Sequence, residues 1–169
     1  MNKFLITSRA GSGKSAVNEI LQQRGYNSRD GDDFEGLAGW VDTHTKQSVE
    51  IDSSQYVDYS EVDWDWDEVV LKRILEQPGE LFLCGSASND LEFFKLFDKV
   101  FVLTIDPERQ LEFLRTRQSP YGKDPKQQQE IIQEQAEFVE AALKLGAVAV
   151  SNDRPLDEVV DQIVELAHG

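Results

Sequence analysis

The chain has a single cysteine, few basic residues and no long apolar run, and each shortage excludes a class of protein. Its 169 residues contain only Cys84, so no disulfide can form within the chain, and a reducing compartment is the default for such a sequence. No apolar segment approaches the about 20 residues that a membrane-spanning helix needs. We therefore expect a cytoplasmic protein without a membrane partner.

Basic residues are outnumbered by acidic ones. Lys and Arg total 17 against 32 Asp and Glu, which gives a formal net charge of −15. A protein that binds nucleic acid needs a basic track to replace the counterions of the phosphates. The sequence shows no such track, so we do not expect nucleic acid as a partner, and the oligomeric state stays open.

The apolar residues indicate the fold class. Short apolar runs at 4–7, 81–84, 100–105 and 147–150 alternate with segments of helical period. Runs that are apolar on both faces are typical of central strands in a parallel sheet covered by helices. The alternation predicts one doubly wound α/β domain over residues 1–169.

Proline and aspartate mark the helix boundaries. Asp106-Pro107 and Asp124-Pro125 each combine an N-cap with a proline at the first helical position, and Pro78-Gly79 ends an earlier helix. Two segments, about 34–67 and about 118–126, fit the alternation poorly. Insertions above the carboxyl ends of parallel strands are where ligands bind in such folds, so we expect the substrate there.

A glycine-rich loop follows the first predicted strand. Residues 8–15 match the phosphate-binding pattern G-x-x-x-x-G-K-[ST] except at its first position, where Ser8 stands. The glycines allow backbone N–H groups to converge on phosphate oxygens, Lys14 reaches the β- and γ-phosphates, and Ser15 ligates Mg²⁺. The next helix offers its N-terminus to the anion. The predicted site for ATP and Mg²⁺ comprises Ala10, Gly11, Ser12, Gly13, Lys14, Ser15 and Ala16.

Residues 4–15 resemble the opening of the small P-loop kinases, the group of adenylate, shikimate and gluconate kinases. Four further stretches carry the resemblance in order: RDGDD (29–33), LFLCGS (81–86), LRTRQSPYGK (114–123) and SNDRPLDEVV (151–160). The resemblance implies a three-layer P-loop NTPase fold whose parallel five-stranded sheet is flanked by helices. It also implies a substrate-binding insertion over about 34–67, a lid over about 115–126, and an adenine site at Arg154 and Pro155.

Two carboxylates follow the second predicted strand. Asp30 and Asp32 are two residues apart, so an extended backbone would point both side chains to one side. The resemblance gives Asp30 a role in supporting Mg²⁺, and gives Asp32 the role of binding the acceptor hydroxyl and taking its proton. Asp33 stands beside them as a further substrate ligand. Ordinary turn chemistry is the alternative interpretation of Asp-Gly-Asp.

Arginines precede a predicted turn in the lid. An arginine that a lid brings to the transferred phosphate contributes about 10³–10⁵ in rate, whereas a surface ion pair contributes under about 1 kcal/mol. Arg115 and Arg117 are therefore candidate catalytic residues beside Lys14 and Asp32, and Lys123 is a further candidate. Some kinases of this group carry an arginine near the position of Phe113, so the contact that each lid arginine makes stays open.

The predicted insertion and the following helix contain few cations. Between residues 34 and 78 the basic side chains are Lys46, Lys72 and Arg73, with His44 in addition. An anionic acceptor needs cationic anchors, each contributing roughly 1.5–3 kcal/mol. Their shortage favours a neutral or cationic acceptor that carries a hydroxyl group.

Aromatic and small polar residues complete the predicted acceptor site. Trp40 is the candidate for stacking on a base or sugar, with Trp64, Trp66, Tyr56 and Tyr59 in the same region or in the core. The stretch WDWDE (64–68) predicts an exposed helix start. Ser86 and Asn89, after the third strand, are candidate hydrogen-bond partners for acceptor hydroxyls, with turn formation as the alternative.

The sequence therefore favours a kinase that moves the γ-phosphoryl group of ATP to a hydroxyl of a nucleoside or another neutral small molecule. A nucleoside monophosphate kinase is the alternative within the same class. A nucleotide-binding regulatory ATPase is the alternative from another class, and we find no hydrophobic–Asp segment to support it, because the third strand ends in Cys84-Gly85. The choice between ATP and GTP stays open.

Overall fold

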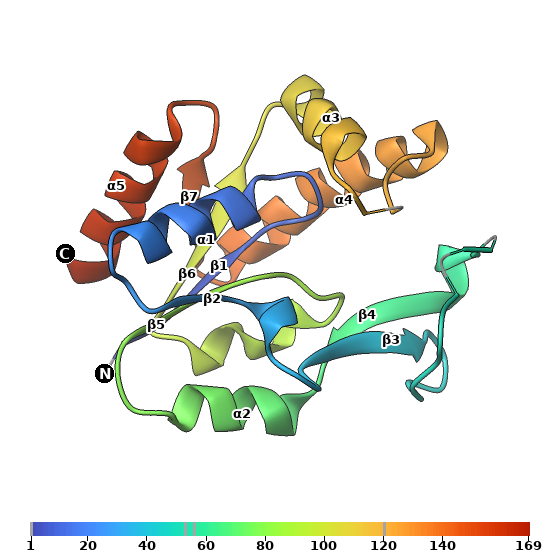
Figure 1. Cartoon of the computed structure of the whole chain (residues 1–169), viewed down its shortest axis with the longest axis horizontal. Helices are drawn as coiled ribbons and strands as arrows, with labels where there is room; N and C mark the ends of the chain where they lie inside the picture. Colours follow the sequence, from blue (N-terminus) through green and yellow to red (C-terminus); the bar gives the residue numbers. More distant parts are fainter. Residues whose placement is uncertain (1, 53, 56, 120) are drawn as a thin grey trace.

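The computed structural model describes residues 2–52, 54–55, 57–119 and 121–169. Within them, five parallel strands form one sheet in the order β2-β5-β1-β6-β7. This arrangement confirms the predicted α/β fold with its parallel five-stranded sheet (Figure 1). The strands are β1 (Lys3–Thr7), β2 (Ser28–Asp30), β5 (Leu81–Cys84), β6 (Lys99–Thr104) and β7 (Val148–Ser151).

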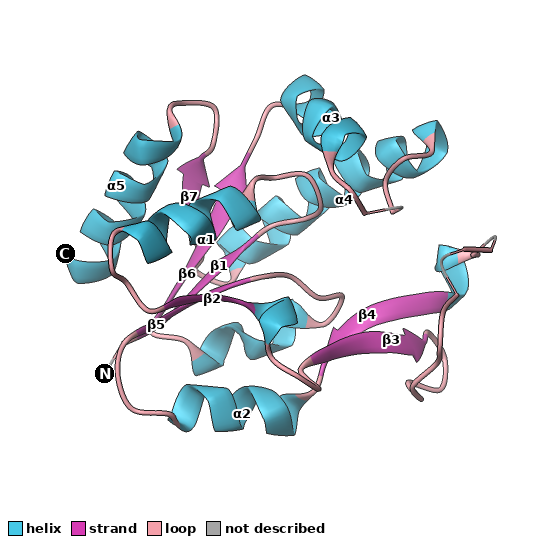
Figure 2. Ribbon diagram, viewed as in Figure 1, coloured by secondary structure: helices cyan, strands magenta, loops and turns pink. Residues whose placement is uncertain are grey.

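Helices cover both faces of the sheet (Figure 2). On one face α1 (Lys14–Gln23) and α5 (Leu156–His168) pack against the sheet, and on the other face lie α2 (Glu68–Glu76), α4 (Pro125–Lys144) and the 3-10 segment η3 (Asp90–Leu96). The central strand β1 shows why both faces are covered. Phe4 and Ile6 pack in the core on the side of α1 and α5, and Leu5 packs in the core on the side of α2, α4 and η3. Successive residues of a strand point to opposite faces, so an all-apolar strand supplies two cores.

The predicted helix starts are confirmed. The Asp106 carboxylate accepts from the N–H of Glu108 at 2.9 Å and begins α3 (Pro107–Thr116). Asp124 accepts from the N–H of Lys126 at 2.8 Å and begins α4. No helix among the described residues is long and apolar enough to cross a membrane.

The insertion folds as an antiparallel hairpin that projects from the sheet on the same side as the lid (Figure 1). It consists of β3 (Ala38–Asp42) and β4 (Val62–Trp66), with the short 3-10 turn η2 (Tyr59–Glu61) before β4. The prediction of a helix start over residues 64–68 is therefore wrong for Trp64 to Trp66, because these residues pair with β3. Only the end of the stretch begins a helix: Asp67 caps α2, which starts at Glu68.

Candidate active site

The phosphate loop joins β1 to α1 and has the backbone that anion binding needs. Gly11 and Gly13 adopt left-handed φ angles of 77° and 91°. Gly13 precedes α1 without any side-chain cap, and the first N–H groups of a helix have no partner inside it. Side chains at the glycines would also collide with the surroundings: a Cβ on Gly11 would lie 2.8 Å from Cγ of Leu114, and one on Gly13 would strike the amide nitrogen of Asn152.

Ser8 replaces the first glycine of the pattern without distorting the loop. It is fully buried, and it is not among the residues with positive φ. Its hydroxyl lies 2.7 Å from the carbonyl of Leu103 and 2.8 Å from Oε1 of Gln135. A small side chain with a hydrogen-bonding group is therefore sufficient at this position.

Lys14 lies over the loop, with Nζ donating to the carbonyls of Ser8 at 3.2 Å and Arg9 at 3.1 Å. Burial and then the positive charges of Arg9 and Arg117 lower the pKa of its ammonium to about 8, against the opposing effects of Asp90 and Asp30. Three cationic groups therefore converge at the phosphate loop.

The three aspartates lie at the end of β2, in a different backbone geometry from the expected one. The strand ends at Asp30, and Gly31–Asp33 forms a 3-10 turn in which Oδ1 of Asp30 accepts from the N–H of Asp32 at 2.9 Å. The expected extended backbone is therefore wrong, because the carboxylate caps a turn. Partial desolvation and then the negative charge of Asp30 raise the pKa of Asp32, while the charge of Lys14 lowers it, so Asp32 lies within electrostatic reach of the phosphate loop. Asp33 is exposed.

The residues predicted to hold Mg²⁺ fit that ion chemically. Ser15 lies exposed in the first turn of α1, and Asp30 is close enough to Lys14 to affect its pKa. Oδ2 of Asp30 accepts no hydrogen bond from a described residue. Both are oxygen donors, which Mg²⁺ prefers.

The structure separates the two lid arginines. Arg117 ends α3, where burial lowers the pKa of its guanidinium, and its charge acts on Lys14. Arg115 is exposed, and its side chain makes no hydrogen bond or ion pair with a described residue. The ammonium of Lys123 donates to the carbonyls of both arginines, at 2.8 Å to that of Arg115, so it caps the end of α3. Arg117 is the lid arginine that faces the loop.

The loop predicted to hold adenine lies beside the phosphate loop. Asn152 is buried, and its Nδ2 donates to the carbonyl of Ser12 at 2.7 Å. Arg154 is partly exposed and its guanidinium donates to the side chain of Gln162. Pro155 is exposed at the start of α5. The two predicted residues thus follow Asn152, which contacts the phosphate loop, and their own contact with a base stays a prediction.

Two residues of α3 join this region without having been predicted. The guanidinium of Arg109 donates to the carbonyl of Asn152 and lies over the ring of Phe113 at 5.6 Å. Gln110 is buried, and its Nε2 donates to the carbonyl of Ala10 at 2.9 Å. Both follow the Asp106-Pro107 cap, so the start of α3 was the signal that could have indicated them.

Aromatic rings connect the hairpin to the lid. The ring centroid of Trp40 lies 5.0 Å from that of Trp64 and 5.4 Å from that of Tyr59, and Tyr59 lies 5.0 Å from Tyr121 of the lid. We call these four residues the aromatic cluster. Trp66 is instead buried in the core, which is the alternative to a substrate contact for this residue. Tyr56 lies outside the described residues.

Of the two polar residues predicted after the third strand, Asn89 holds the hairpin. Its Oδ1 accepts from the N–H of Trp66 at 2.9 Å, and its Nδ2 donates to the carbonyl of the same residue at 3.0 Å. Asn89 is thus engaged with the backbone of the hairpin, and its contact with an acceptor hydroxyl stays a prediction. Ser86 is partly exposed and makes no hydrogen bond with a described residue, so its role toward an acceptor stays a prediction.

A buried ion pair at the loop was not anticipated. The guanidinium of Arg9 lies 3.1 Å from Oδ2 of Asp90, whose side chain has no exposed surface, and it stacks at 3.8 Å over the ring of Phe138. The same oxygen of Asp90 accepts from the hydroxyl of Thr7 at 3.0 Å. The available signal was a long cationic side chain in a loop of small residues.

Cys84 ends β5 under the site. Its thiol is fully buried, 3.6 Å from the hydroxyl of Ser28. Burial raises the pKa of this thiol to about 12, so at neutral pH it is not a nucleophile.

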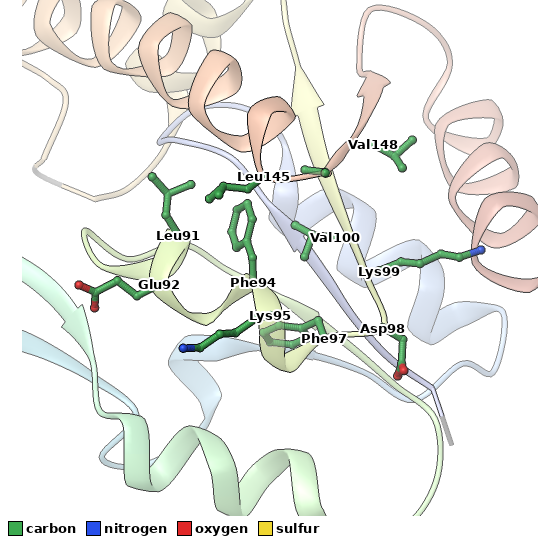
Figure 3. A pocket seen from close by; sticks show the side chains of 12 residues that line it. Leu91, Glu92, Phe94, Lys95, Phe97, Asp98, Lys99, Val100, Leu145 and Val148 are labelled. Atoms are coloured by element: carbon green, nitrogen blue, oxygen red, sulfur yellow. The ribbon is translucent and has the colours of Figure 1, made fainter.

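A groove of about 410 Å³ lies at the amino ends of β6 and β7, whereas the phosphate loop follows the carboxyl end of β1 (Figure 3). It is bordered by η3, by the start of β6 and by the turn between α4 and β7. Leu91, Phe94 and Leu145 line it together with Lys95 and Asp98. None of the predicted site residues lies in its lining, so the groove is separate from the phosphate loop.

No protein-family model matches the sequence, and no curated protein matches it. Solved structures do match over almost the whole chain. A gluconokinase from Sinorhizobium meliloti has 18% identity and a TM-score of 0.57, with 99% of this chain and 94% of that chain covered. A shikimate kinase from Acinetobacter baumannii in complex with shikimate has 14% identity and a TM-score of 0.65, with 98% and 92% covered.

A shikimate kinase from Aquifex aeolicus gives 18% identity and a TM-score of 0.57, with 99% of this chain and 96% of that chain covered. These likenesses show the fold. The chain has the fold that these gluconokinase and shikimate kinase structures share.

Proposed function

We propose that this protein transfers the γ-phosphoryl group of ATP to a hydroxyl of a small molecule, with a nucleoside or another neutral metabolite as acceptor. The observation that supports it is the convergence of Lys14, Arg117 and Asp32 at an uncapped phosphate loop. Similar solved structures are named as gluconokinase and shikimate kinase, so the fold is one that small-molecule kinases use.

In the proposed reaction the site residues would have two roles, which are to position the reactants and to neutralise charge on the phosphates. Phosphoryl transfer needs little covalent help from the protein and relies on orientation and on neutralising the charge of the phosphoryl oxygens. The N–H groups of the loop would hold the phosphates, with Lys14 and Arg117 beside the transferred group. When bound at Ser15 and Asp30, Mg²⁺ would neutralise phosphate charge.

Asp32 is the proposed base. Its carboxylate would accept a hydrogen bond from the acceptor hydroxyl and take the proton as the new O–P bond forms and ADP leaves. Burial and the charge of Asp30 raise the pKa of Asp32, and a raised pKa makes a carboxylate a better proton acceptor.

The charges of the hairpin support a neutral acceptor. The hairpin carries Lys46, whose ammonium pairs with Asp63 at 2.6 Å and with Asp65 at 3.5 Å. These aspartates alternate along β4 with Trp64, so they occupy the face opposite to the aromatic cluster. A carboxylate or phosphate on the acceptor would find no free cation from this hairpin among its described residues.

The test is an ADP-release assay with Mg-ATP that screens nucleosides, nucleoside monophosphates, sugars, amino alcohols, gluconate and shikimate. We expect stimulation by an uncharged class. Stimulation by monophosphates or acids alone would overturn the acceptor class, and tight ATP binding without any stimulation would overturn the kinase proposal in favour of a nucleotide-binding regulatory protein.

The variant Asp32→Asn tests the base. We expect transfer to fall by at least about 100-fold, while the Kd for ATP stays within about twofold, because Asp32 faces the acceptor. The matched control is Asp33→Asn in the same turn, because Asp33 is also exposed and is not among the groups whose charge shifts the pKa of Lys14, and its expected effect is small. Full transfer activity in Asp32→Asn would remove this residue from the mechanism.

A further inference from the structure

Arg9 is a phosphate-loop residue that the proposed reaction does not use. Its backbone is fixed on both sides: its N–H donates to Oε1 of Gln135 at 2.9 Å, and its carbonyl accepts from Lys14 at 3.1 Å. Its side chain leaves the loop toward the end of β5. There it is held between Ala87, the buried Asp90 and the ring of Phe138.

The hydrogen bonds of the guanidinium leave one edge unused. Nη1 donates to the carbonyl of Ala87 and to Oδ2 of Asp90, both at 3.1 Å, and Nη2 approaches Oδ1 of Asp90 at 3.4 Å. An arginine carries five N–H donors in a rigid fork. The Nε–H and the second N–H of Nη2 have no acceptor among the described residues, and together they form the side of the fork that binds two oxygens at once.

The charge of this guanidinium acts on titratable groups of the phosphate loop, of α4 and of the segment predicted as a lid. Its charge helps to lower the pKa of Lys14 in the loop. Burial raises the pKa of Glu134 in α4 and raises that of Tyr121 in the lid to about 12, and the charge of Arg9 opposes both increases. Three groups from three elements therefore surround Arg9, and its side chain keeps 18% exposure.

We infer that Arg9 is an acceptor-binding residue whose free N–H edge donates to two neighbouring hydroxyl oxygens of the acceptor. The inference rests on the proposed function and assigns a specificity-determining residue to it. The buried carboxylate of Asp90 pairs with the guanidinium of Arg9 and offsets its charge. The edge thus offers directional donors without net charge, which suits a polyol or the sugar of a nucleoside better than an acid.

The decisive variant is Arg9→Lys, which keeps a cation opposite Asp90 and removes the planar edge. The probe is the nucleoside, sugar or amino alcohol that stimulates ADP release most in the screen above. We expect its KM to rise at least about tenfold, with the Kd for ATP within about twofold. The matched control is Arg24→Lys, because Arg24 is also held by two aspartates, Asp157 and Asp161, but in an exposed pair.

A second variant separates binding from a merely structural role. Removing one member of a buried pair leaves an uncompensated charge, whereas removing both does not. Arg9→Gln combined with Asp90→Asn should therefore fold, as its thermal unfolding would show, and still lose affinity for the probe. If the double variant or Arg9→Lys kept the wild-type KM, the inference would be wrong while the kinase activity stood. A wild-type protein without acceptor-stimulated ADP release would overturn both.

Discussion

The two halves of the candidate site bind in different ways. On the nucleotide side the backbone forms the site: two glycines with left-handed φ and an uncapped helix start. On the proposed acceptor side the candidate groups are side chains, namely the aromatic cluster, Arg9 and Asp32. A backbone site tolerates a change of side chain such as Ser8, whereas each change on the acceptor side alters which molecule fits.

The difference follows from what surrounds each half. The phosphate loop packs against buried side chains: Leu114 and Gln110 of α3 contact it, and so does Asn152, which follows β7. The aromatic cluster has partly exposed rings that meet each other across the hairpin and the lid. The nucleotide half is thus fixed by the core, and the acceptor half by contacts between two projecting segments.

The largest expected effect comes from a side chain that joins the halves. Arg117→Ala should lower kcat by at least about 10³-fold, because a lid arginine stabilises the charge of the transferred group. Arg115→Ala is the control two residues away, exposed and without a partner among the described residues, and it should stay within about threefold. Steady-state kinetics of both variants measure the difference. Equal losses would show that the lid acts without distinguishing its arginines.

Gly13→Ala tests the backbone half. The new Cβ would collide with Asn152 at a φ of 91°, so we expect the Kd for ATP to rise at least about 100-fold, equivalent to one lost charge-assisted hydrogen bond. Gly25→Ala is the control, with a φ of 87° and no atom within 4 Å. It carries the same backbone strain but should keep ATP affinity. Calorimetric titration with ATP measures the Kd of both variants. Equal Kd values would mean that the close packing around Gly13 does not matter for ATP binding.

The lowered pKa of Lys14 predicts a smaller effect, which is a pH dependence of ATP affinity. Its pKa is about 8 before nucleotide binds, and bound phosphates raise it because they favour the charged form. ATP affinity should be nearly constant below about pH 7, should be about twofold lower at pH 8 and should be about tenfold lower at pH 9. At pH 8 binding should take up about half a proton, measured by calorimetry in buffers of different ionisation enthalpy. Lys14→Arg, which stays charged, should show no uptake, and uptake in that variant would assign the proton elsewhere.

Most of the fold and the nucleotide half were predictable from local patterns. Apolar runs such as residues 81–84 coincide with β5, and the Asp-Pro pairs mark the starts of α3 and α4. These signals depend on short-range physics: capping, the restricted φ of proline, and strands buried on both faces. The loop was also recognisable, because its remaining glycines and Lys14 are adjacent in sequence.

The acceptor half was less predictable because its contacts are distant in sequence. The local pattern of residues 64–68 predicts a helix start, and only pairing with β3, more than twenty residues earlier, makes Trp64 to Trp66 a strand. Arg9 meets Asp90 across 81 positions, and no local pattern announces that pair. Asp30 and Asp32 were identified as candidates, yet their geometry follows from a turn that Asp30 itself caps.

The buried state of Cys84 makes the chain suitable for site-specific labelling. A thiol with a pKa of about 12 and no exposed surface does not react with maleimides at neutral pH. A cysteine introduced at the exposed position of Arg115 would therefore be the one reactive thiol, without removal of the natural cysteine. A fluorophore attached there would report the movement of the lid as nucleotide and acceptor are added in turn.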